Sequence, residues 1–279
     1  MAIPISVEEA NLNANSMSAS GQSASPGGAE GPVRPARTAA VIPAAGRGVR
    51  LGPGAPKALR PLSGTPMLVH AVRAMARSRS VVLVVVVAPP DGADEVRRLL
   101  DAYPLTGTTE VVVVPGGETR QESVRRGLAA VPEDITTVLV HDAARPLVPV
   151  DTVDAVVTAV REGAPAVVPA LPLADTVKQV EPRTGERAGE PEPVVGTPER
   201  ALLRAVQTPQ GFDRATLVAA HEKIALEGEG ATDDAGMVER LGVEVVVVPG
   251  HEEAFKVTRP LDLVLAEAVL ARRRATDGF

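Results

Sequence analysis

The sequence predicts an α/β protein with a doubly wound, mostly parallel β-sheet and a projecting β-hairpin arm. From about residue 38 onward, short β-branched runs alternate with amphipathic stretches, which is the order expected of strand–helix–strand units. Continuous valine runs such as VVLVVVV and EVVVV lack the alternation of a half-exposed sheet. We therefore expect helices to cover both faces of the sheet.

Each element has its own local signal. The capping-box pair Thr119 and Glu122 predicts a helix start, and further starts are expected at Thr65 with Pro66, at Asp91 and at Asp151. The expected strands are residues 39–43, 81–88, 110–114, 136–141, 166–170, 243–248 and 255–258. Ligands of such sheets bind beyond the carboxyl ends of the strands, where the loops gather.

Composition limits the class of protein. The chain has 279 residues, 44% of them hydrophobic, and a formal net charge of -6, so it can bury a full core and lacks the basic surface typical of nucleic-acid binding. It contains no cysteine, which excludes disulfides and thiol catalysis. No apolar run reaches the roughly 20 residues of a spanning helix, and the N-terminus lacks a signal-peptide pattern. We expect a cytoplasmic protein that binds neither nucleic acid nor membrane.

Two regions depart from the strand–helix rhythm. Residues 1–36 are rich in Ser, Ala, Asn, Gly and Pro without periodicity, so we expect a disordered tail ahead of one domain over residues 37–279. Residues 171–200 contain two short extendable pieces, 176–180 and 194–197, joined by a polar turn. An arm this thin has no core of its own, so we expect a dimerisation arm that packs on a second subunit.

The loop after the first strand, PAAGRGVRLGPGAPKAL, is suited to an anion. It matches neither the Walker pattern nor G-x-G-x-x-G, but Gly46 and Gly48 permit close backbone approach, and Arg50 and Lys57 can balance phosphate charge. Lys57 is one of only four lysines in the chain, which suggests that a compact point charge is needed there. The alternative is a solvated basic loop.

Polar groups follow two more strands at the same edge of the sheet. The turn PGGETRQESV, with Gly117, Glu118 and Ser123, can present backbone groups and a hydroxyl to a base or ribose; the alternative is a simple capped helix start. Asp142 in VHDAARPLV follows an apolar strand, where a carboxylate is costly to desolvate without a cation or metal. Arg145 could be its partner in a structural ion pair.

Two further polar positions are expected to be structural. His141 and its neighbour Asp142 point to opposite faces of the strand, so we expect His141 to pack. Asp233 and Asp234 in ATDDAGM suit the first turn of a helix, with a metal-binding pair as the alternative. No Asp-x-Asp occurs in the chain, which disfavours a metal-dependent glycosyltransferase.

Seven motifs in this order, PAAGRGVRLGPGAPKAL, PGGETRQESV, VHDAARPLV, DTVK, QTPQGF, TDDAG and FKVTRPLDL, closely resemble the 2-C-methyl-D-erythritol 4-phosphate cytidylyltransferase family. The resemblance runs from about residue 39 to 270 and implies a Rossmann-like nucleotidyltransferase fold. It implies transfer of a cytidylyl group from CTP to methylerythritol phosphate, with release of pyrophosphate, in isoprenoid precursor synthesis. It also implies magnesium bound to the nucleotide and a homodimer formed through the arm.

The same resemblance assigns three groups of site residues. The positions for CTP are Ala44, Ala45, Gly46, Gly48, Gly117, Glu118 and Ser123. The cations at the transferred phosphate are Arg50, Lys57 and Lys256. The positions for the sugar phosphate are Asp142, Ala143, Arg145, Thr176, Arg200 and Thr208, some of them supplied by the partner's arm, and Asp142 is also the candidate magnesium ligand.

Two departures and two alternatives accompany this interpretation. The arm's turn EPRTGERAGEPEP is longer and more acidic than the family's usual hairpin, and aromatic residues make up only 1% of the chain, so cytosine recognition must use backbone groups and Ser123. Another polyol phosphate such as ribitol 5-phosphate is an alternative acceptor, although Ala144 in HDAARP favours methylerythritol phosphate. A noncatalytic nucleotide sensor is the alternative of another class, but it would not need Arg50, Lys57 and Lys256.

Overall fold

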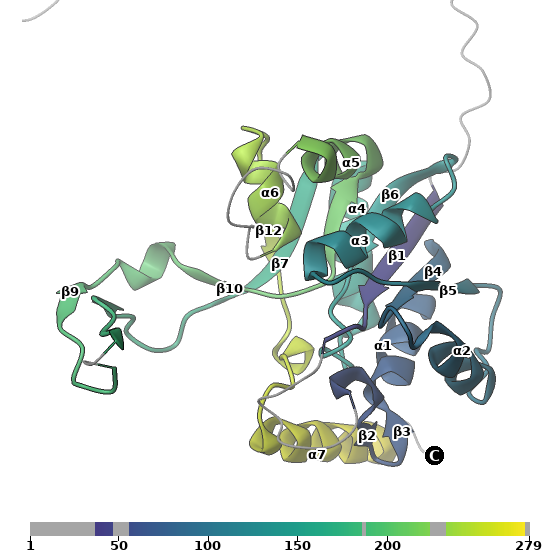
Figure 1. Ribbon diagram of the computed structural model, residues 1–279, viewed down its shortest axis with the longest axis horizontal. Coiled ribbons are helices and arrows are strands. Elements are labelled where there is room, and N and C mark those ends of the chain that lie inside the picture. The colour runs from purple at the N-terminus through teal and green to yellow at the C-terminus, as the bar shows by residue number, and fades with distance from the viewer. Residues whose placement is uncertain (1–36, 47–55, 186–187, 224–232, 277–279) are drawn as a thin grey trace, which may run out of the picture. The chain divides into compact units, whose positions relative to one another are not determined.

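An eight-stranded β-sheet organises the fold (Figure 1). The structure is a computed structural model that describes residues 37–46, 56–185, 188–223 and 233–276. The expectations for the tail, for Gly48 and for Arg50 therefore lie outside the described residues. The sheet consists of β1 (Arg37–Pro43), β4 (Val81–Ala88), β5 (Glu110–Pro115), β6 (Ile135–Val140), β7 (Ala166–Pro172), β10 (Arg204–Val206), β11 (Gln210–Asp213) and β12 (Val246–Pro249).

The sheet is mostly parallel, as predicted. The strand order is β10-β7-β11-β6-β1-β4-β5, and β12 also pairs with β7. Parallel pairing joins β1 to β4 and β6, β4 to β5, and β7 to β12. β11 is antiparallel to both β6 and β7, and β10 is antiparallel to β7. These two antiparallel strands carry the chain back from the arm into the sheet.

Helices cover both faces of the sheet, and this explains the continuous valine runs. In β4, Val84 and Val86 join one core while Val85 and Val87 join the other, because successive side chains of a strand point to opposite faces. One core is closed by α1 (Met67–Ala76), α2 (Ala93–Asp101) and α4 (Val150–Arg161). The other is closed by α3 (Arg120–Ala129), α5 (Arg214–Lys223) and α6 (Asp234–Arg240).

All four predicted helices are present. Thr119 caps α3 as expected and Asp151 lies in the first turn of α4, but the other two helices begin later than predicted. The Thr119 hydroxyl accepts the backbone N–H of Glu122 at 3.0 Å and caps α3. Thr65 and Pro66 instead form β3 (Thr65–Pro66), which pairs with β2 (Pro61–Leu62) ahead of α1. Asp91 does not cap α2, because Gly92 occupies the cap position without a side-chain hydrogen bond.

The predicted strand at residues 255–258 is also wrong. This segment follows the 3-10 helix η5 (Glu252–Ala254) and leads into α7 (Pro260–Thr276). Its backbone is tied to the β6 loop by a bond of 2.8 Å from the Val257 N–H to the Ala144 carbonyl, which is too little pairing for a strand. Val257 is buried in a third small core that also includes residues of α7.

The arm leaves the main sheet between β7 and β10 (Figure 1). It contains the predicted hairpin, β8 (Gln179–Val180) antiparallel to β9 (Val194–Gly196), followed by the 3-10 helix η4 (Arg200–Leu202). Lys178 Nζ donates to Thr197 Oγ1 across the hairpin at 2.8 Å. β8 and β9 pair with one another and form a separate sheet.

Candidate active site

A cleft of about 1110 Å³ lies at the carboxyl ends of β1, β4, β5 and β6. Parallel strands end at the same edge, so the loops that follow them meet there. Its walls come from segments that are distant in the sequence, including the 3-10 helix η2 (Lys57–Leu59). The lining residues are 43–46, 56–58, 89–91, 117–120, 123, 142–144, 256 and 258.

The cleft brings together most of the expected site residues. Ten of them line it, namely Ala44, Ala45, Gly46, Lys57, Gly117, Glu118, Ser123, Asp142, Ala143 and Lys256. Thr208 and Arg145 adjoin it through hydrogen bonds to segments that form its walls. Thr176 and Arg200 lie on the arm and are not among the lining residues.

The turn between β5 and α3 is fixed by close packing. A Cβ on Gly116 would lie 2.7 Å from the Ala88 carbonyl oxygen and 2.9 Å from Ser123 Oγ, so only glycine fits. The Gly117 N–H donates to Ser123 Oγ at 3.1 Å, and Ser123 is buried. The turn therefore presents Gly117 and Ser123 to the cleft in a defined geometry.

The first turn of α3 strengthens this arrangement. The Glu122 carboxylate accepts the Glu118 N–H at 2.9 Å and also pairs with Arg126. The Glu118 backbone bond, followed by the Arg126 contact, lowers the pKa of Glu122. Arg126 also donates to the Gly116 carbonyl. Both the backbone before the helix and the first turn of the helix are therefore held in place. The Glu118 side chain itself is exposed at the cleft.

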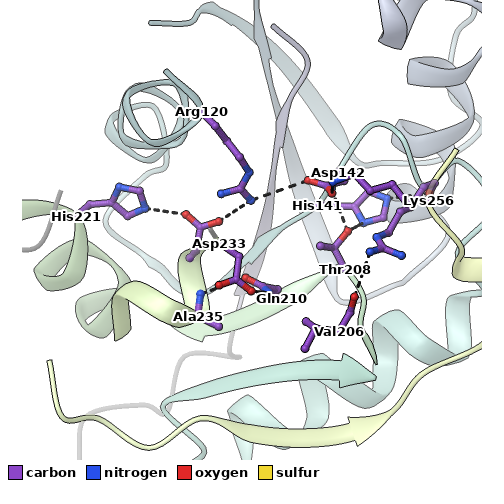
Figure 2. A network of polar contacts seen from close by, with 12 residues as sticks. Arg120, His141, Asp142, Val206, Thr208, Gln210, His221, Asp233, Ala235 and Lys256 are labelled. Atoms are coloured by element: carbon purple, nitrogen blue, oxygen red, sulfur yellow. Dashed lines mark hydrogen bonds and ion pairs between the residues drawn. The ribbon is translucent and has the colours of Figure 1, made fainter. Parts of the chain in front are cut away.

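Asp142 and Lys256 form an ion pair in the cleft (Figure 2). Lys256 Nζ lies 2.7 Å from Asp142 Oδ2, and the neighbouring Val257 bond to Ala144 fixes the segment that carries the lysine. Burial raises the pKa of Asp142, but the Lys256 ammonium and the Arg120 guanidinium outweigh it and hold that pKa below its usual value. Asp142 is therefore ionised at neutral pH.

Thr208 and His141 set the backbone position of Asp142. Thr208 lies between β10 and β11, and its hydroxyl accepts the Asp142 N–H at 3.0 Å. His141 Nε2 lies 3.1 Å from the Arg145 carbonyl, which can only accept, so this nitrogen carries the proton. His141 Nδ1, 3.1 Å from Thr208 Oγ1, then accepts from that hydroxyl. Burial lowers the pKa of His141 to about 4, which keeps the ring neutral, and His141 is buried as expected.

Arg145 does not form the structural ion pair with Asp142 that was the alternative from the sequence. Its guanidinium donates to the Ala254 carbonyl at 2.7 Å and to the Val206 carbonyl at 3.2 Å. This alternative is wrong because the carboxylate faces Lys256 and Arg120 instead. Arg145 connects the β6 loop to β10 and to η5, and η5 ends two residues before Lys256. Arg145 therefore holds together the segments that form this wall of the cleft.

A charged network beside the cleft was not predicted as part of the site. Arg120 lies 2.7 Å from Asp234 and 4.0 Å from Asp142, and His221 Nε2 lies 3.0 Å from Asp234. Figure 2 shows the Arg120 guanidinium between Asp142 and the carboxylate that contacts His221. Asp233 caps α6 by accepting the Gly236 N–H at 2.9 Å, so the expected helix start there is confirmed.

The position of Arg120 in the sequence is itself a signal of a role in the site. Arg120 is the first residue of α3, where a cation opposes the positive end of the helix dipole. A cation at that position therefore needs a nearby anion or a functional reason. Burial lowers the pKa of Arg120, but the Asp234 and Asp142 carboxylates outweigh it and raise the pKa overall.

Comparisons with known proteins agree over nearly the whole described chain. Residues 38–272 match the family model IspD: 2-C-methyl-D-erythritol 4-phosphate cytidylyltransferase. The chain is 79% identical over 245 residues to the 2-C-methyl-D-erythritol 4-phosphate cytidylyltransferase of Streptomyces coelicolor, with 88% of this chain and 89% of that protein covered. The protein of the same name from Streptomyces avermitilis is 78% identical over 244 residues, covering 88% of this chain and 96% of its own.

Solved structures give the same result. The crystal structure of 2-C-methyl-D-erythritol 4-phosphate cytidylyltransferase from Thermus thermophilus has a TM-score of 0.62 at 37% identity, with 82% of this chain and 97% of that chain covered. The 4-diphosphocytidyl-2C-methyl-D-erythritol synthase structure from Anaerococcus prevotii has a TM-score of 0.70 at 28% identity, with 85% of this chain and 96% of that chain covered. The chain belongs to the 2-C-methyl-D-erythritol 4-phosphate cytidylyltransferase family.

Proposed function

We infer that the chain transfers the cytidylyl group of CTP to 2-C-methyl-D-erythritol 4-phosphate. The products are 4-diphosphocytidyl-2-C-methyl-D-erythritol, an isoprenoid precursor, and pyrophosphate. The observation that carries this conclusion is the family match over residues 38–272, which includes every segment that lines the cleft. Relatives at 79% and 78% identity bear the name of this activity.

The chemistry is a substitution at the α-phosphorus of CTP. A phosphate oxygen of the acceptor forms the new P–O bond, the bond to the β-phosphate breaks, and pyrophosphate leaves with the electron pair. The nucleophile is already an anion, so the site needs positioned cations rather than a strong base. Lys57 and Lys256 line the cleft from two separate segments. We propose that they, with Arg50, offset the charge on the transferred phosphate.

Different residues of the cleft suit different parts of the substrates. Gly117 and Ser123 lie in the rigid turn before α3, and their backbone and hydroxyl groups support cytidine binding there. None of the described residues that line the cleft is aromatic, so they offer no ring for base stacking. Asp142, next to Ala143 in the chain, contacts Lys256, which supports binding of the acceptor beside that lysine.

We propose magnesium as the cofactor. Asp142 supplies an ionised carboxylate in the cleft, an oxygen ligand of the kind that magnesium prefers. Among the described residues, no group of three or more His, Cys, Asp or Glu could hold a metal ion. The cleft therefore fits a cation held by one carboxylate together with the nucleotide phosphates. When bound, magnesium would reduce the negative charge of the triphosphate.

We propose a homodimer in which the arm completes the partner's site. The arm exposes apolar side chains, with Val194 56%, Val195 58% and Leu202 76% exposed, and a second subunit would cover them. Thr176 and Arg200 lie on the same arm, outside the residues that line the chain's own cleft. An acceptor-binding role for these two residues is therefore consistent with the partner's cleft.

Subunit complementation tests the shared site. Lys57→Ala and Arg200→Ala proteins should each have low activity. When the two are unfolded together and refolded as a mixture, activity should return, because each mixed dimer has one cleft with both residues intact. A mixture that forms dimers without regaining activity would show that the arm does not serve the partner's cleft.

We also propose a cytoplasmic location, because both substrates are multiply charged phosphates that do not cross a membrane unaided. In the part of the chain that the structure describes, no helix is both long and apolar enough to cross a membrane. The net charge of -6 provides no general attraction for nucleic acid.

Pyrophosphate release tests the proposed reaction. The purified chain is assayed with CTP, UTP, ATP and GTP, each combined with methylerythritol phosphate or ribitol 5-phosphate, with and without EDTA. We expect release with CTP and methylerythritol phosphate, and loss of that release with EDTA. Faster release with ribitol 5-phosphate would contradict the acceptor. Nucleotide binding without release from any pair would indicate a sensor.

A further inference from the structure

We propose that Asp234, supported by His221, is a positioning residue of the active site that holds the Arg120 guanidinium in the cleft, where Arg120 contacts a phosphate oxygen of the bound nucleotide. The identity of that nucleotide rests on the proposed function. The contacts within the network come from the structure itself. Arg120 thus adds a cation to the cleft beyond Lys57 and Lys256.

The network connects three helices to the cleft. His221 lies on α5, Asp234 begins α6 and Arg120 begins α3. Asp234 Oδ1 lies 3.0 Å from His221 Nε2, and its Oδ2 lies 2.7 Å from the Arg120 guanidinium. Each carboxylate oxygen of Asp234 thus has one partner, and the carboxylate cannot turn without losing both. This fixes the direction from which it attracts Arg120.

Burial makes Asp234 and Arg120 unequal partners. The Asp234 side chain is 0% exposed, whereas Arg120 is 33% exposed and lines the cleft. A fully buried carboxylate is stable only while it is paired, so Asp234 holds Arg120 strongly. The partly exposed guanidinium still has donors to offer, since a guanidinium carries five N–H groups. Those on the cleft side are available to an anionic ligand.

The unequal distances also affect Asp142. Arg120 is closer to Asp234, at 2.7 Å, than to Asp142, at 4.0 Å. Attraction falls with distance, so Asp234 keeps the guanidinium from closing onto Asp142. Asp142 then retains one close partner, Lys256. Both Arg120 and Asp142 consequently remain accessible to substrates in the cleft.

A simple structural brace between α3 and α6 explains less of this geometry. Such a brace needs no exposure to the cleft, and it gains nothing from a second carboxylate on the cleft side. It would also place a cation at the amino end of α3 against the helix dipole without benefit. A positioned substrate contact accounts for the exposure, the direction and the location of Arg120 together.

A double-mutant cycle tests whether Asp234 acts through Arg120, and thermal unfolding of the same variants separates a substrate contact from a brace. CTP affinity with magnesium is measured by calorimetry without acceptor, and pyrophosphate release is measured with acceptor, for the unmodified chain, Asp234→Asn, Arg120→Gln and the double variant. We expect each single substitution to lower kcat/KM by about 10- to 100-fold, the scale of a misplaced contact. The double variant should be no weaker than Arg120→Gln, because Asp234 acts through Arg120.

Thermal unfolding and a second cycle keep the test decisive. A brace predicts that CTP affinity falls only as far as thermal stability falls, whereas a substrate contact predicts that Arg120→Gln loses affinity even while the variant remains folded at the assay temperature. Should Asp234→Asn fail to fold, the same cycle is run with His221→Gln, for which we expect a smaller fall that also vanishes in the Arg120→Gln background. If the effects of the two substitutions on kcat/KM multiply in whichever of these two cycles can be measured, the proposal is overturned.

A matched control and a rescue variant complete the design. Arg37→Gln breaks another Arg–Asp ion pair, with Asp134 at the amino end of β1, and should leave CTP affinity unchanged. Arg120→Lys should recover part of the affinity that Arg120→Gln loses, because the positive charge returns. Equal affinity for Arg120→Lys and Arg120→Gln would contradict a contact with phosphate. Absence of CTP turnover by the unmodified chain would instead count against the proposed function.

Discussion

Replacing Thr208 by valine tests how the end of β6 is held. The substitution keeps the shape of the side chain and removes one hydroxyl, which accepts the Asp142 N–H at 3.0 Å and lies 3.1 Å from His141 Nδ1. Two buried groups lose their partner, and each such loss costs about 1–3 kcal/mol. We therefore expect the free energy of unfolding to fall by about 2–6 kcal/mol.

Urea denaturation at pH 7 measures this loss. The unfolding midpoint should decrease with an unchanged slope, since the surface exposed on unfolding stays the same. Thr208→Ser keeps the hydroxyl and serves as the control, which should lose less than Thr208→Val. A valine variant as stable as the serine variant would refute the hydrogen-bond reasoning. Pyrophosphate release should fall as well, because Asp142 shifts when its backbone is released.

Three other substitutions or conditions probe the same region. Burial lowers the pKa of His141 to about 4 from an ordinary 6.5, so the unfolded chain binds the proton more readily than the folded chain does. The contribution of the neutral ring to the free energy of unfolding is therefore present in full above about pH 6.5. It falls by about 3 kcal/mol as the pH is lowered to 4. Urea midpoints at pH 7, 5.5 and 4.5 should show this fall, and His141→Gln should reduce it. Gly116→Ala would place a Cβ 2.7 Å from the Ala88 carbonyl oxygen, so it should lower stability by about 1–3 kcal/mol and weaken CTP binding in calorimetry. Lys256→Ala should lower kcat by about 10²–10³-fold, with partial recovery in Lys256→Arg, and a kcat close to that of the unmodified chain would contradict a role for Lys256 at the reacting phosphate.

Much of the fold could be predicted because burial on both faces leaves a clear mark in a strand. In β4 successive valines face the two cores alternately. Both faces must therefore be apolar, which gives a continuous apolar run that a half-exposed strand does not need. β10 and β11 carry no such run. They are three and four residues long, and their pairing depends on β7 and β6 rather than on their own sequence. Their direction was therefore not visible before the structure.

The site could be predicted where the loops at the strand ends carry their own chemistry. Gly117 and Ser123 belong to a short turn whose geometry is fixed locally, and Asp142 directly follows an apolar strand. The partners of these residues could not be predicted in the same way. Arg145 follows Asp142 by three positions, yet Lys256, far along the chain, takes its place beside the carboxylate. Proximity in sequence was a poor guide because η5 and α7 bring that lysine to the cleft.

The charges of the cleft explain how a protein with a net charge of -6 can bind a triphosphate. Arg120 and Lys256 are each paired with a carboxylate, Asp234 or Asp142, which reduces repulsion between the two cations when no substrate is bound. Asp234 is buried behind its cation and Asp142 lies in the cleft itself. An arriving triphosphate can therefore meet Arg120 without displacing Asp234, whereas it must compete with Asp142 for Lys256. The first cation is held in place before the substrate arrives, as preorganised stabilisation of charge requires, whereas the second must leave Asp142 to contact the phosphate.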